Sequence, residues 1–352
     1  MSLRFAYVSC FALLIAGCSS DSNDGPNTEE EWKRSVTQGM HNVVGKDIAA
    51  LHAAAVELQK AAPAAARGWS ATEDAAAILA TTTAWLKARA AYERSEGAIA
   101  PLFPDIDAAI DARYDDFLEE LSPAGDPNLF DDEGVTGMHA IERILFVDTT
   151  PQAVIDVEAT LPGYVKATWP ADASESQAFK SKLCEKLVAD TAELKAQWAT
   201  VPIDLQGAFG GLIALMNEQR EKVNKAASAE EESRYAQRTL ADIRDNLTGT
   251  RAAYAVFRPW IQSKQGGTDV DASIEAGFDE LAQAYASLPG DAFPPLPPDF
   301  SAENPTDANL ESAFGALFAR VQRAADPNRA GSVVNGMNQA AVLLNFPEFV
   351  EE

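Results

Sequence analysis

Apolar residues recur at intervals of three and four along most of this chain, and alanine is abundant between them. This spacing places the apolar side chains on one face of a helix. Strands would instead show a two-residue alternation between hairpin signals, and the sequence contains no clean example. The pattern therefore predicts an all-α protein. We expect helices over residues 29–61, 70–99, 105–121, 134–147, 151–165, 174–200, 205–228, 230–263, 269–287, 306–325 and 329–346.

Two stretches interrupt the helical pattern. They are "SPAGDPNLFDDEG" at residues 122–134 and "LPGDAFPPLPPDFSAENP" at residues 288–305. Proline fixes φ and has no amide hydrogen to donate, so neither stretch can continue a helix. We expect both to be loops.

Two motifs occur twice and in the same order. The tetrapeptide "RAAY" stands at residues 89–92 and again at 251–254, and "GMHAIERILF" at 137–146 is echoed by "GMNQAAVLLNF" at 336–346. Repetition of this kind indicates two structural units of common design. We therefore predict two related up-and-down helical bundles, the first over residues 31–168 and the second over residues 169–352.

Only the first copy of each motif carries a polar pair. Glu93 and Glu96 follow "RAAY", and His139 and Glu142 lie within the second motif. Residues three apart share a helix face, so three carboxylates and an imidazole would converge if both faces point inward. Such a cluster repels itself unless it is protonated or holds a cation, and helical bundles bind metal ions in this way. The second copy has Ala255, Arg258, Asn338 and Ala341 at these positions.

A solvated surface explains the same pairs without any site. Arg89 and Arg143 stand close in sequence to Glu93 and Glu142, and ion pairs of this kind are common on helix surfaces. His139 suits a hydrogen-bonded position in the core as well as a ligand role. Both interpretations stay open at this point.

The N-terminus has the form of a bacterial export signal. Arg4 precedes an apolar run over residues 5–17, which is too short to span a membrane comfortably and ends in "LIAGC". We predict a lipoprotein signal peptide over residues 1–17, lipidation of Cys18, and a polar tether over residues 18–30. A plain secretory signal with an incidental cysteine is the alternative.

Composition narrows the class of protein. The chain has 352 residues, of which 47% are hydrophobic, and a formal net charge of -25. A nucleic-acid backbone would be repelled by this charge, whereas cations would be attracted. Once Cys10 is removed and Cys18 is lipidated, Cys184 has no partner for an internal disulfide. Its amphipathic surroundings predict a buried structural cysteine.

The first half resembles a known family. The stretch "AWLKARAAYERSEGAIAPLFPDIDAAIDARYDDF", followed by "VTGMHAIERILF", is similar to the imelysin-like family and most of all to its EfeO-type periplasmic iron-uptake lipoproteins. The shared features are Tyr-Glu-x-x-Glu at residues 92–96, the Asp-rich run at 105–113 and Gly-x-His-x-x-Glu at 137–142. In the second half, Arg-Asp-Asn-x-x-Gly at 244–249 resembles the imelysin branch. Gln237 departs from the EfeO-type pattern, which has a histidine there.

The resemblance implies a fold of two helical bundles and a metal site at the His-x-x-Glu motif. The ligands that it implies are Glu93, Glu96, His139, Glu142 and Asp111, with Asp105 and Glu218 as additional candidates. One imidazole among carboxylates forms a hard, oxygen-rich site, which favours Fe²⁺ or Fe³⁺ and leaves zinc and manganese open. We therefore expect a lipid-anchored protein of the periplasm or cell surface that binds iron for uptake, with an iron permease or a peroxidase as a candidate partner.

Two other functions fit parts of the sequence. The family is also classed with metallopeptidases, but a zincin needs His-Glu-x-x-His, and Ala140 and Arg143 stand at the positions of the glutamate and the second histidine. A zinc peptidase would therefore need an unusual ligand set. The third candidate is a surface lipoprotein that binds a protein or polysaccharide in the groove between the bundles.

Overall fold

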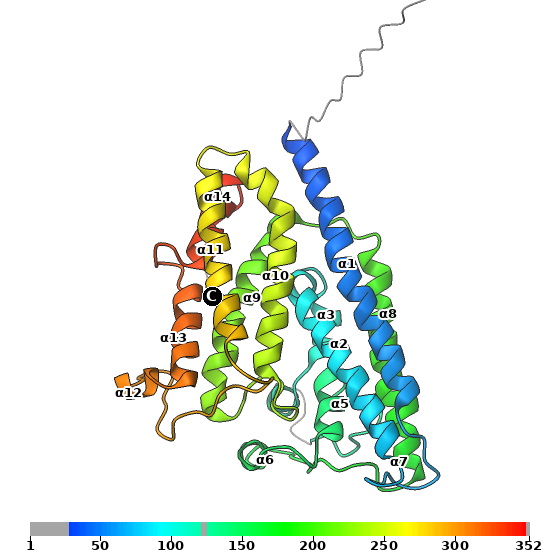
Figure 1. Cartoon of the computed structure of the whole chain (residues 1–352). Coiled ribbons are helices and arrows are strands. Elements are labelled where there is room, and N and C mark those ends of the chain that lie inside the picture. The colour runs from blue at the N-terminus through cyan, green and yellow to red at the C-terminus, as the bar shows by residue number, and fades with distance from the viewer. Residues whose placement is uncertain (1–27, 121–124, 350–352) are drawn as a thin grey trace, which may run out of the picture.

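The computed structural model describes residues 28–120 and 125–349 (Figure 1). The predicted signal peptide, Cys18 and most of the predicted tether lie outside these residues. Helices and connecting loops make up the described chain, and it contains no strand. None of its helices combines the length and the apolar character needed to cross a bilayer. The helices are α1 (Glu29–Ala61), α2 (Ala75–Leu102), α3 (Pro104–Asp111), α4 (Tyr114–Glu120), α5 (Gly137–Leu145), α6 (Gln152–Glu158), α7 (Ala173–Ala178), the π-helical turn η1 (Phe179–Leu183), α8 (Cys184–Trp198), α9 (Leu205–Lys225), the 3₁₀ turn η2 (Ala226–Ser228), α10 (Thr239–Gln262), α11 (Gly267–Ala286), α12 (Asp307–Leu310), α13 (Ala313–Ala325) and α14 (Val333–Leu343).

The first helix shows why these segments fold as they do. Thr28 caps α1: its hydroxyl accepts from the amide of Glu31 (3.2 Å), and the Glu31 carboxylate accepts from the amide of Thr28 (3.0 Å). This reciprocal pair satisfies amide donors that have no partner inside the helix. The buried side chains of α1 recur every three or four residues, including Val36, Met40 and Val44, and this stripe packs against α2 and α8.

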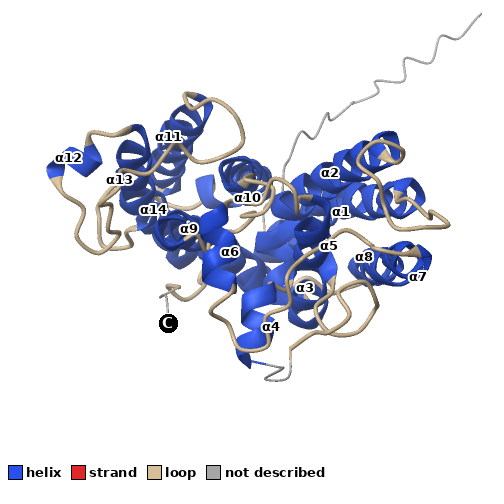
Figure 2. Ribbon diagram, turned by 90° about the horizontal axis from the view of Figure 1, so that it is seen from below, coloured by secondary structure: helices blue, strands red, loops and turns tan. Residues whose placement is uncertain are grey.

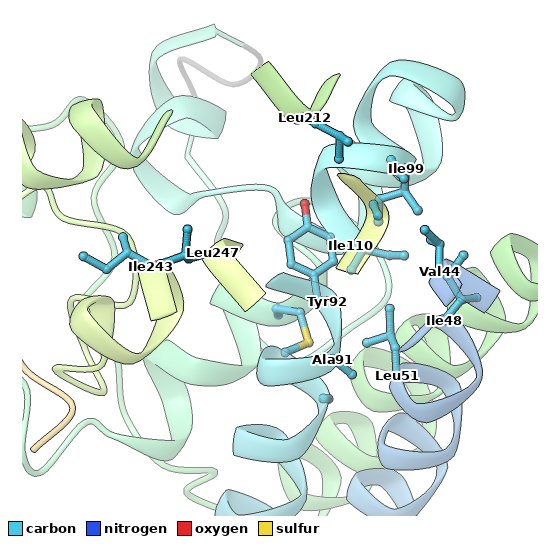
Figure 3. Close-up of a cluster of buried hydrophobic side chains, with 14 of the residues drawn as sticks. Val44, Ile48, Leu51, Ala91, Tyr92, Ile99, Ile110, Leu212, Ile243 and Leu247 are labelled. Atoms are coloured by element: carbon cyan, nitrogen blue, oxygen red, sulfur yellow. The ribbon is translucent and has the colours of Figure 1, made fainter. Parts of the chain in front are cut away.

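The helices fall into two groups that meet along α2, α9 and α10 (Figure 2). In the first group, α1, α2, α3, α5 and α8 pack together. In the second, α9, α10, α11, α13 and α14 pack together. Buried apolar residues from both groups form one connected core, part of which Figure 3 shows around Tyr92 and Ile110. The all-α fold is as predicted.

The repeated motifs occupy matching places in the two groups. In the first, the Tyr92 hydroxyl of α2 donates to Asp107 of α3 over 2.9 Å. In the second, the Tyr254 hydroxyl of α10 donates to Asp271 of α11 over 3.0 Å. The same tyrosine thus ties the long helix to the helix that follows it, as expected for related bundles.

The division between the bundles stays a prediction, and the packing favours a later boundary than residue 168. Helix α8 lies within the predicted second bundle, yet it packs against α1, α3 and α5 of the first group. The connection between α8 and α9, at residues 199–204, separates the two groups better.

Two of the expected helices differ from the structure where the site lies. The helix expected over residues 105–121 is interrupted at residues 112–113, giving α3 and α4. The helix expected over residues 230–263 begins only at Thr239. Residues 229–238 instead form a compact loop, in which Ala229 and Gln237 adopt positive φ values of 60° and 53°. A positive φ does not fit a right-handed helix, so the chain turns here.

Candidate metal centre

His139 lies in the first turn of α5, where every side chain of the helix is buried. The helix begins at Gly137, whose φ is +87°. A Cβ atom at this position would lie 2.4 Å from the carbonyl oxygen of Ile110, so only glycine permits this approach of α5 to α3. The contact brings His139 beside Asp111, the last residue of α3.

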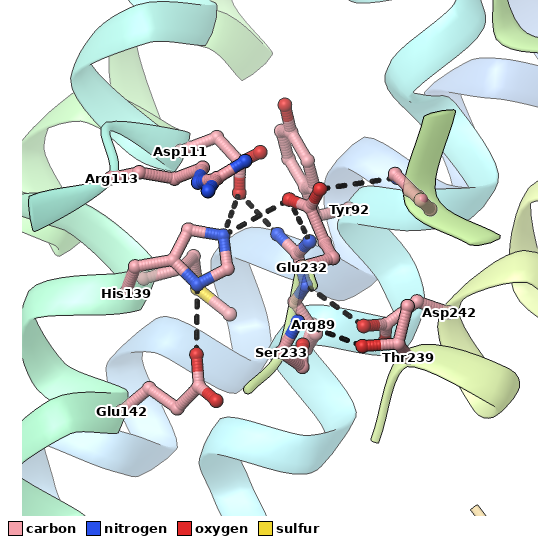
Figure 4. Close-up of polar contacts among 12 residues, drawn as sticks. Arg89, Tyr92, Asp111, Arg113, His139, Glu142, Glu232, Ser233, Thr239 and Asp242 are labelled. Carbon is pink, nitrogen blue, oxygen red and sulfur yellow. Dashed lines mark hydrogen bonds and ion pairs between the residues drawn. The ribbon is translucent and has the colours of Figure 1, made fainter. Parts of the chain in front are cut away.

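Two carboxylates from separate parts of the chain converge on the Nε2 atom of His139 (Figure 4). Its Nε2 atom lies 3.4 Å from an oxygen of Asp111 and 3.1 Å from an oxygen of Glu232. One ligand atom from each of the three residues can be chosen so that all lie within 4.8 Å of one another. An imidazole nitrogen with two carboxylate oxygens is a donor set that fits iron, manganese or zinc. We call Asp111, His139 and Glu232 the triad.

Glu142, which the resemblance implies as a ligand, faces the other ring nitrogen of His139. Its Oε2 atom lies 2.8 Å from Nδ1 of His139, on the side of the ring away from the triad oxygens. Its Oε1 atom accepts from the amides of Tyr235 (3.1 Å) and Ala236 (2.8 Å). A carboxylate on the far nitrogen fixes the orientation and tautomer of a metal-binding histidine. The geometry therefore gives Glu142 an orienting position.

The loop at residues 229–238 delivers Glu232, which the sequence interpretation missed. Arg234 holds the loop to α4 by donating to both carboxylate oxygens of Asp115, and the amide of Ser233 donates to the Thr239 hydroxyl over 3.2 Å. Gln237 donates to Glu231 (3.1 Å) and to the backbone oxygen of Arg234 (2.7 Å). The stretch "AEEESRYAQ" consists mainly of good helix formers, so its composition gives no warning of the turn.

A fully buried arginine offsets the negative charge of the triad carboxylates. The Arg89 guanidinium donates to Glu232 over 2.8 Å and pairs with Asp111 and Glu93. Because it contacts both carboxylates of the triad, Arg89 supplies positive charge at the place where a cation would bind. The alternative of a surface ion pair between Arg89 and Glu93 is therefore wrong, because both side chains are completely buried.

Glu93 and Glu96 form ion pairs with a buried lysine, Lys222. Nζ of Lys222 lies 3.1 Å from Glu93, 3.3 Å from Glu96 and 3.1 Å from Glu218. It also donates to the side-chain oxygen of Asn246 over 3.2 Å. We call Glu93, Glu96, Glu218 and Asn246 the oxygen cage. The repulsion expected among the carboxylates is thus relieved by Arg89 and Lys222.

The Arg-Asp-Asn-x-x-Gly motif assembles this cage. Asn246 donates to the carboxylates of Glu93 (2.6 Å) and Glu96 (2.8 Å). Gly249, one turn later, lets α10 touch α2, because a Cβ atom there would lie 2.0 Å from the carbonyl oxygen of Arg94. The motif therefore fixes the second bundle against the polar face of the first.

The electrostatic environment shifts the pKa values of Glu232 and Glu96, two of the carboxylates near Lys222, in opposite directions. Burial raises the pKa of Glu232, but Lys222, His139 and Arg89 hold it well below its usual value. Burial and the charge of Glu218 instead raise the pKa of Glu96 well above normal. Burial and Arg89 lower the pKa of His139, yet the neighbouring carboxylates outweigh them and hold it well above its usual value. In this arrangement the imidazole lies between carboxylates at both nitrogens, which favours the imidazolium.

A cavity of about 430 Å³ gives access to these groups. Its lining includes Asp111 and Glu232 of the triad, Glu96 and Glu218 of the cage, and Asp107. Burial and the charge of Asp111 raise the pKa of Asp107 to about 7. Asp105, an additional candidate, is exposed in the first turn of α3 and does not line the cavity. Asp107, two residues later, lines the cavity instead. A second, more apolar cavity of about 590 Å³ shares Glu96 and Glu218 with the first.

Arg143 shows why the zincin arrangement does not form here. It donates to Glu158 over 3.0 Å and to the backbone oxygen of Val165 over 2.7 Å, away from the triad. Its guanidinium stacks on the Tyr114 ring at 3.8 Å. The residue at the place of a second zincin histidine is therefore a structural arginine.

Several proteins are similar to this chain in sequence. An Efem/EfeO family lipoprotein of Staphylococcus haemolyticus (strain JCSC1435) is 27% identical over 87% of this chain and 92% of its own length. The iron uptake system component EfeM of Pseudomonas syringae pv. syringae (strain B728a) is 27% identical over 56% of each chain. The iron uptake system component EfeO of Yersinia pseudotuberculosis serotype I (strain IP32953) is 29% identical over 55% of this chain. The match spans only 41% of that relative's length.

Solved structures share the fold. An imelysin-like protein from Psychrobacter arcticum 273-4 superposes with a TM-score of 0.51 at 13% identity, covering 92% of this chain and 98% of that one. A structure from Parabacteroides distasonis ATCC 8503 gives the same TM-score at 16% identity over 94% of this chain and 97% of that one. The family model described as Imelysin (Peptidase_M75) matches residues 46–323. With most of its length inside that match, the chain belongs to the imelysin family.

Proposed function

We propose that this protein is a lipid-anchored, extracytoplasmic component of an iron-uptake system, and that it binds Fe²⁺ or Fe³⁺ as cargo at the triad. The observation that carries the proposal is the convergence of Asp111, His139 and Glu232, the two carboxylates of which line an acidic cavity. Three relatives named for the EfeO and EfeM type, two of them called iron uptake system components, support the same role.

The surroundings of the triad suit reversible capture of a cation. The cavity carries Asp107, Glu96 and Glu218, and the whole chain has a net charge of -25, so cations are drawn toward it. Glu142 faces Nδ1 of His139, and a carboxylate there favours a proton on Nδ1, which leaves Nε2 free to bind the ion once the ring is neutral. Glu93 and Glu96, proposed as ligands from the resemblance, lie against Lys222 and Arg89 in this structure and are not part of the triad.

Metal titration tests the proposal. The chain from Ser19 onward, treated with chelator, is titrated calorimetrically with Fe²⁺ under anaerobic conditions and with Fe³⁺, Mn²⁺ and Zn²⁺. We expect stoichiometric binding that His139→Ala and Glu232→Gln each weaken by about 100-fold. His52→Ala is the matched control, because His52 lies on α1 and bonds Thr191 instead. Equal affinity in wild type and in His139→Ala would refute the triad as the iron site.

The anchor is tested separately. We propose that Cys18 carries the lipid and that the anchored protein passes iron to a membrane permease or works with a peroxidase. Cys18→Ser should release the protein from the bacterial membrane fraction into the soluble extracytoplasmic fraction. Retention of Cys18→Ser on the membrane would contradict lipidation at this residue.

A further inference from the structure

Lys222 occupies an environment that is unusual for a lysine. Its side chain is 2% exposed, and its ammonium contacts four oxygens that come from α2, α9 and α10. Lysine side chains normally keep the ammonium in water, because its desolvation is expensive. The four oxygens of the cage take over the role of that water.

The donor set of the cage is one that hard metal cations prefer. Three carboxylates and an amide oxygen resemble the oxygen ligands of manganese, magnesium or calcium sites. Lys222 adds a single positive charge to three carboxylates, one of which also pairs with Arg89, whereas a divalent or trivalent cation in the place of Lys222 would neutralise more of their charge. The cage therefore favours such a cation over Lys222 on electrostatic grounds.

The cage lies next to the triad, and the cavity beside Lys222 can accommodate its ammonium group. One oxygen of Glu232 faces Nζ of Lys222 at 4.0 Å, while the other faces His139 at 3.1 Å. Lys222 lines the cavity of about 430 Å³, so rotation of its flexible stem would carry the ammonium into that space. Glu232 of the triad therefore lies beside the lysine that fills the cage, and both groups of residues contribute to the lining of the same cavity.

We propose that Lys222 is a built-in competitor for the incoming cation: its ammonium fills the oxygen cage until a multivalent metal ion displaces it into the cavity. This inference rests on the proposed cation-binding function and adds to it a means of release. Return of the ammonium to the cage would weaken the binding of the metal ion, so the lysine would make uptake reversible.

Lys222→Met tests the competition, because methionine keeps an unbranched apolar stem and removes the charge. Titration with Mn²⁺ should give at least about tenfold tighter binding than in wild type, and Lys222→Met/Glu96→Gln should lose that gain. Lys225→Met is the matched control, since Lys225 lines the same cavity but lies outside the cage. No gain in Lys222→Met, or an equal gain in Lys225→Met, would overturn the proposal.

Labelling of the unaltered protein gives an independent measurement. Reductive methylation followed by peptide mass spectrometry reports how accessible each lysine amine is. Lys222 should be protected after chelator treatment and labelled about tenfold faster in saturating Mn²⁺. Lys225 should be labelled at the same rate in both conditions. Binding of Mn²⁺ with continued protection of Lys222 would overturn the displacement.

The two proposals fail in different ways. If wild type binds no metal but Lys222→Met does, and Glu96→Gln removes this binding, the competition stands and the iron-binding function of the wild-type triad falls. If wild type binds metal through His139 and Lys222→Met binds it no better, the triad stands and the competition falls.

Discussion

At the scale of the residue, the site depends on which carboxylate faces which nitrogen of His139. Asp111 and Glu232 share Nε2, whereas Glu142 alone faces Nδ1. A ring that donates from Nδ1 offers its Nε2 lone pair to a metal ion, so Glu142 determines whether the triad has three donors. In the proposed site, Glu142 would therefore control binding without contacting the metal ion.

Glu142→Gln should change the tautomer of the His139 ring without disturbing the fold. The glutamine oxygen can still accept from the amides of Tyr235 and Ala236, but its NH₂ group faces Nδ1 and favours the tautomer protonated at Nε2. We expect a drop of about 10–100-fold in metal affinity with little change in melting temperature. Calorimetry measures the affinity, and ¹⁵N chemical shifts of the imidazole report the tautomer. An unchanged affinity would show that Glu142 does not orient the ring.

At the scale of the element, the site depends on how closely α5 approaches α3. Gly137→Ala places a methyl group 2.4 Å from the carbonyl oxygen of Ile110, at a φ of +87°. Gly266→Ala is a matched control, because Gly266 has a φ of +79° and nothing within 4 Å of an added Cβ. Both variants should be less stable than wild type, and Gly137→Ala should lose about 1–3 kcal/mol more.

Urea unfolding of the two variants provides the measurement. The additional loss in Gly137→Ala should come with weaker metal binding, because α5 carries His139 and the end of α3 carries Asp111. Gly266→Ala should bind metal as wild type does. Equal losses of stability would show that the unusual φ alone is costly and that the contact with Ile110 adjusts easily.

The sequence predicted the elements better than it predicted the site. Apolar periodicity is a local property, so it identified α1, α9 and α11 and the all-α fold. The loop at residues 229–238 depends instead on Arg234 bonding Asp115 and on backbone amides bonding Glu142, which are contacts between distant segments. Glu232 was therefore hidden inside an expected helix. The motif resemblance pointed to His139 and Asp111, which lie side by side in the structure. No local pattern shows that Glu93 and Glu96 pair with the buried Arg89 and Lys222.

Over the whole molecule, the two bundles differ in the polar residues that they retain at matching positions. The first keeps His139, while Asn338 at the matching place of α14 bonds the backbone of Phe349 through both its side-chain atoms. Arg258, at the place of Glu96, pairs with Asp271. These polar side chains of the second copy therefore have their hydrogen-bond and ion-pair partners within the second bundle. This bundle contributes to the site from its inner face, through Lys222, Glu232 and Asn246.

Joining the bundles buries carboxylates, and the stability of the chelator-treated protein should therefore depend on pH. Burial and the charge of Asp111 raise the pKa of Asp107 to about 7, from an ordinary value near 4. The folded protein then binds a proton that the unfolded chain releases. The stabilising contribution is complete below the unfolded pKa and is lost as pH rises through about 7. The raised pKa values of Glu96 and His139 act in the same direction.

Unfolding free energies measured at pH 6 and pH 8 test this argument. Wild type should be more stable at pH 6, and Asp107→Asn should reduce the difference by about 1 kcal/mol, because asparagine can still accept from Tyr92 but cannot titrate. Asp105→Asn is the matched control, since Asp105 lies exposed on the same helix and should leave the difference unchanged. Saturating metal should also reverse the preference, because a cation binds the deprotonated carboxylates. Greater stability at pH 8 without metal would mean that Arg89 and Lys222 already neutralise the cavity, leaving no excess negative charge to attract a cation.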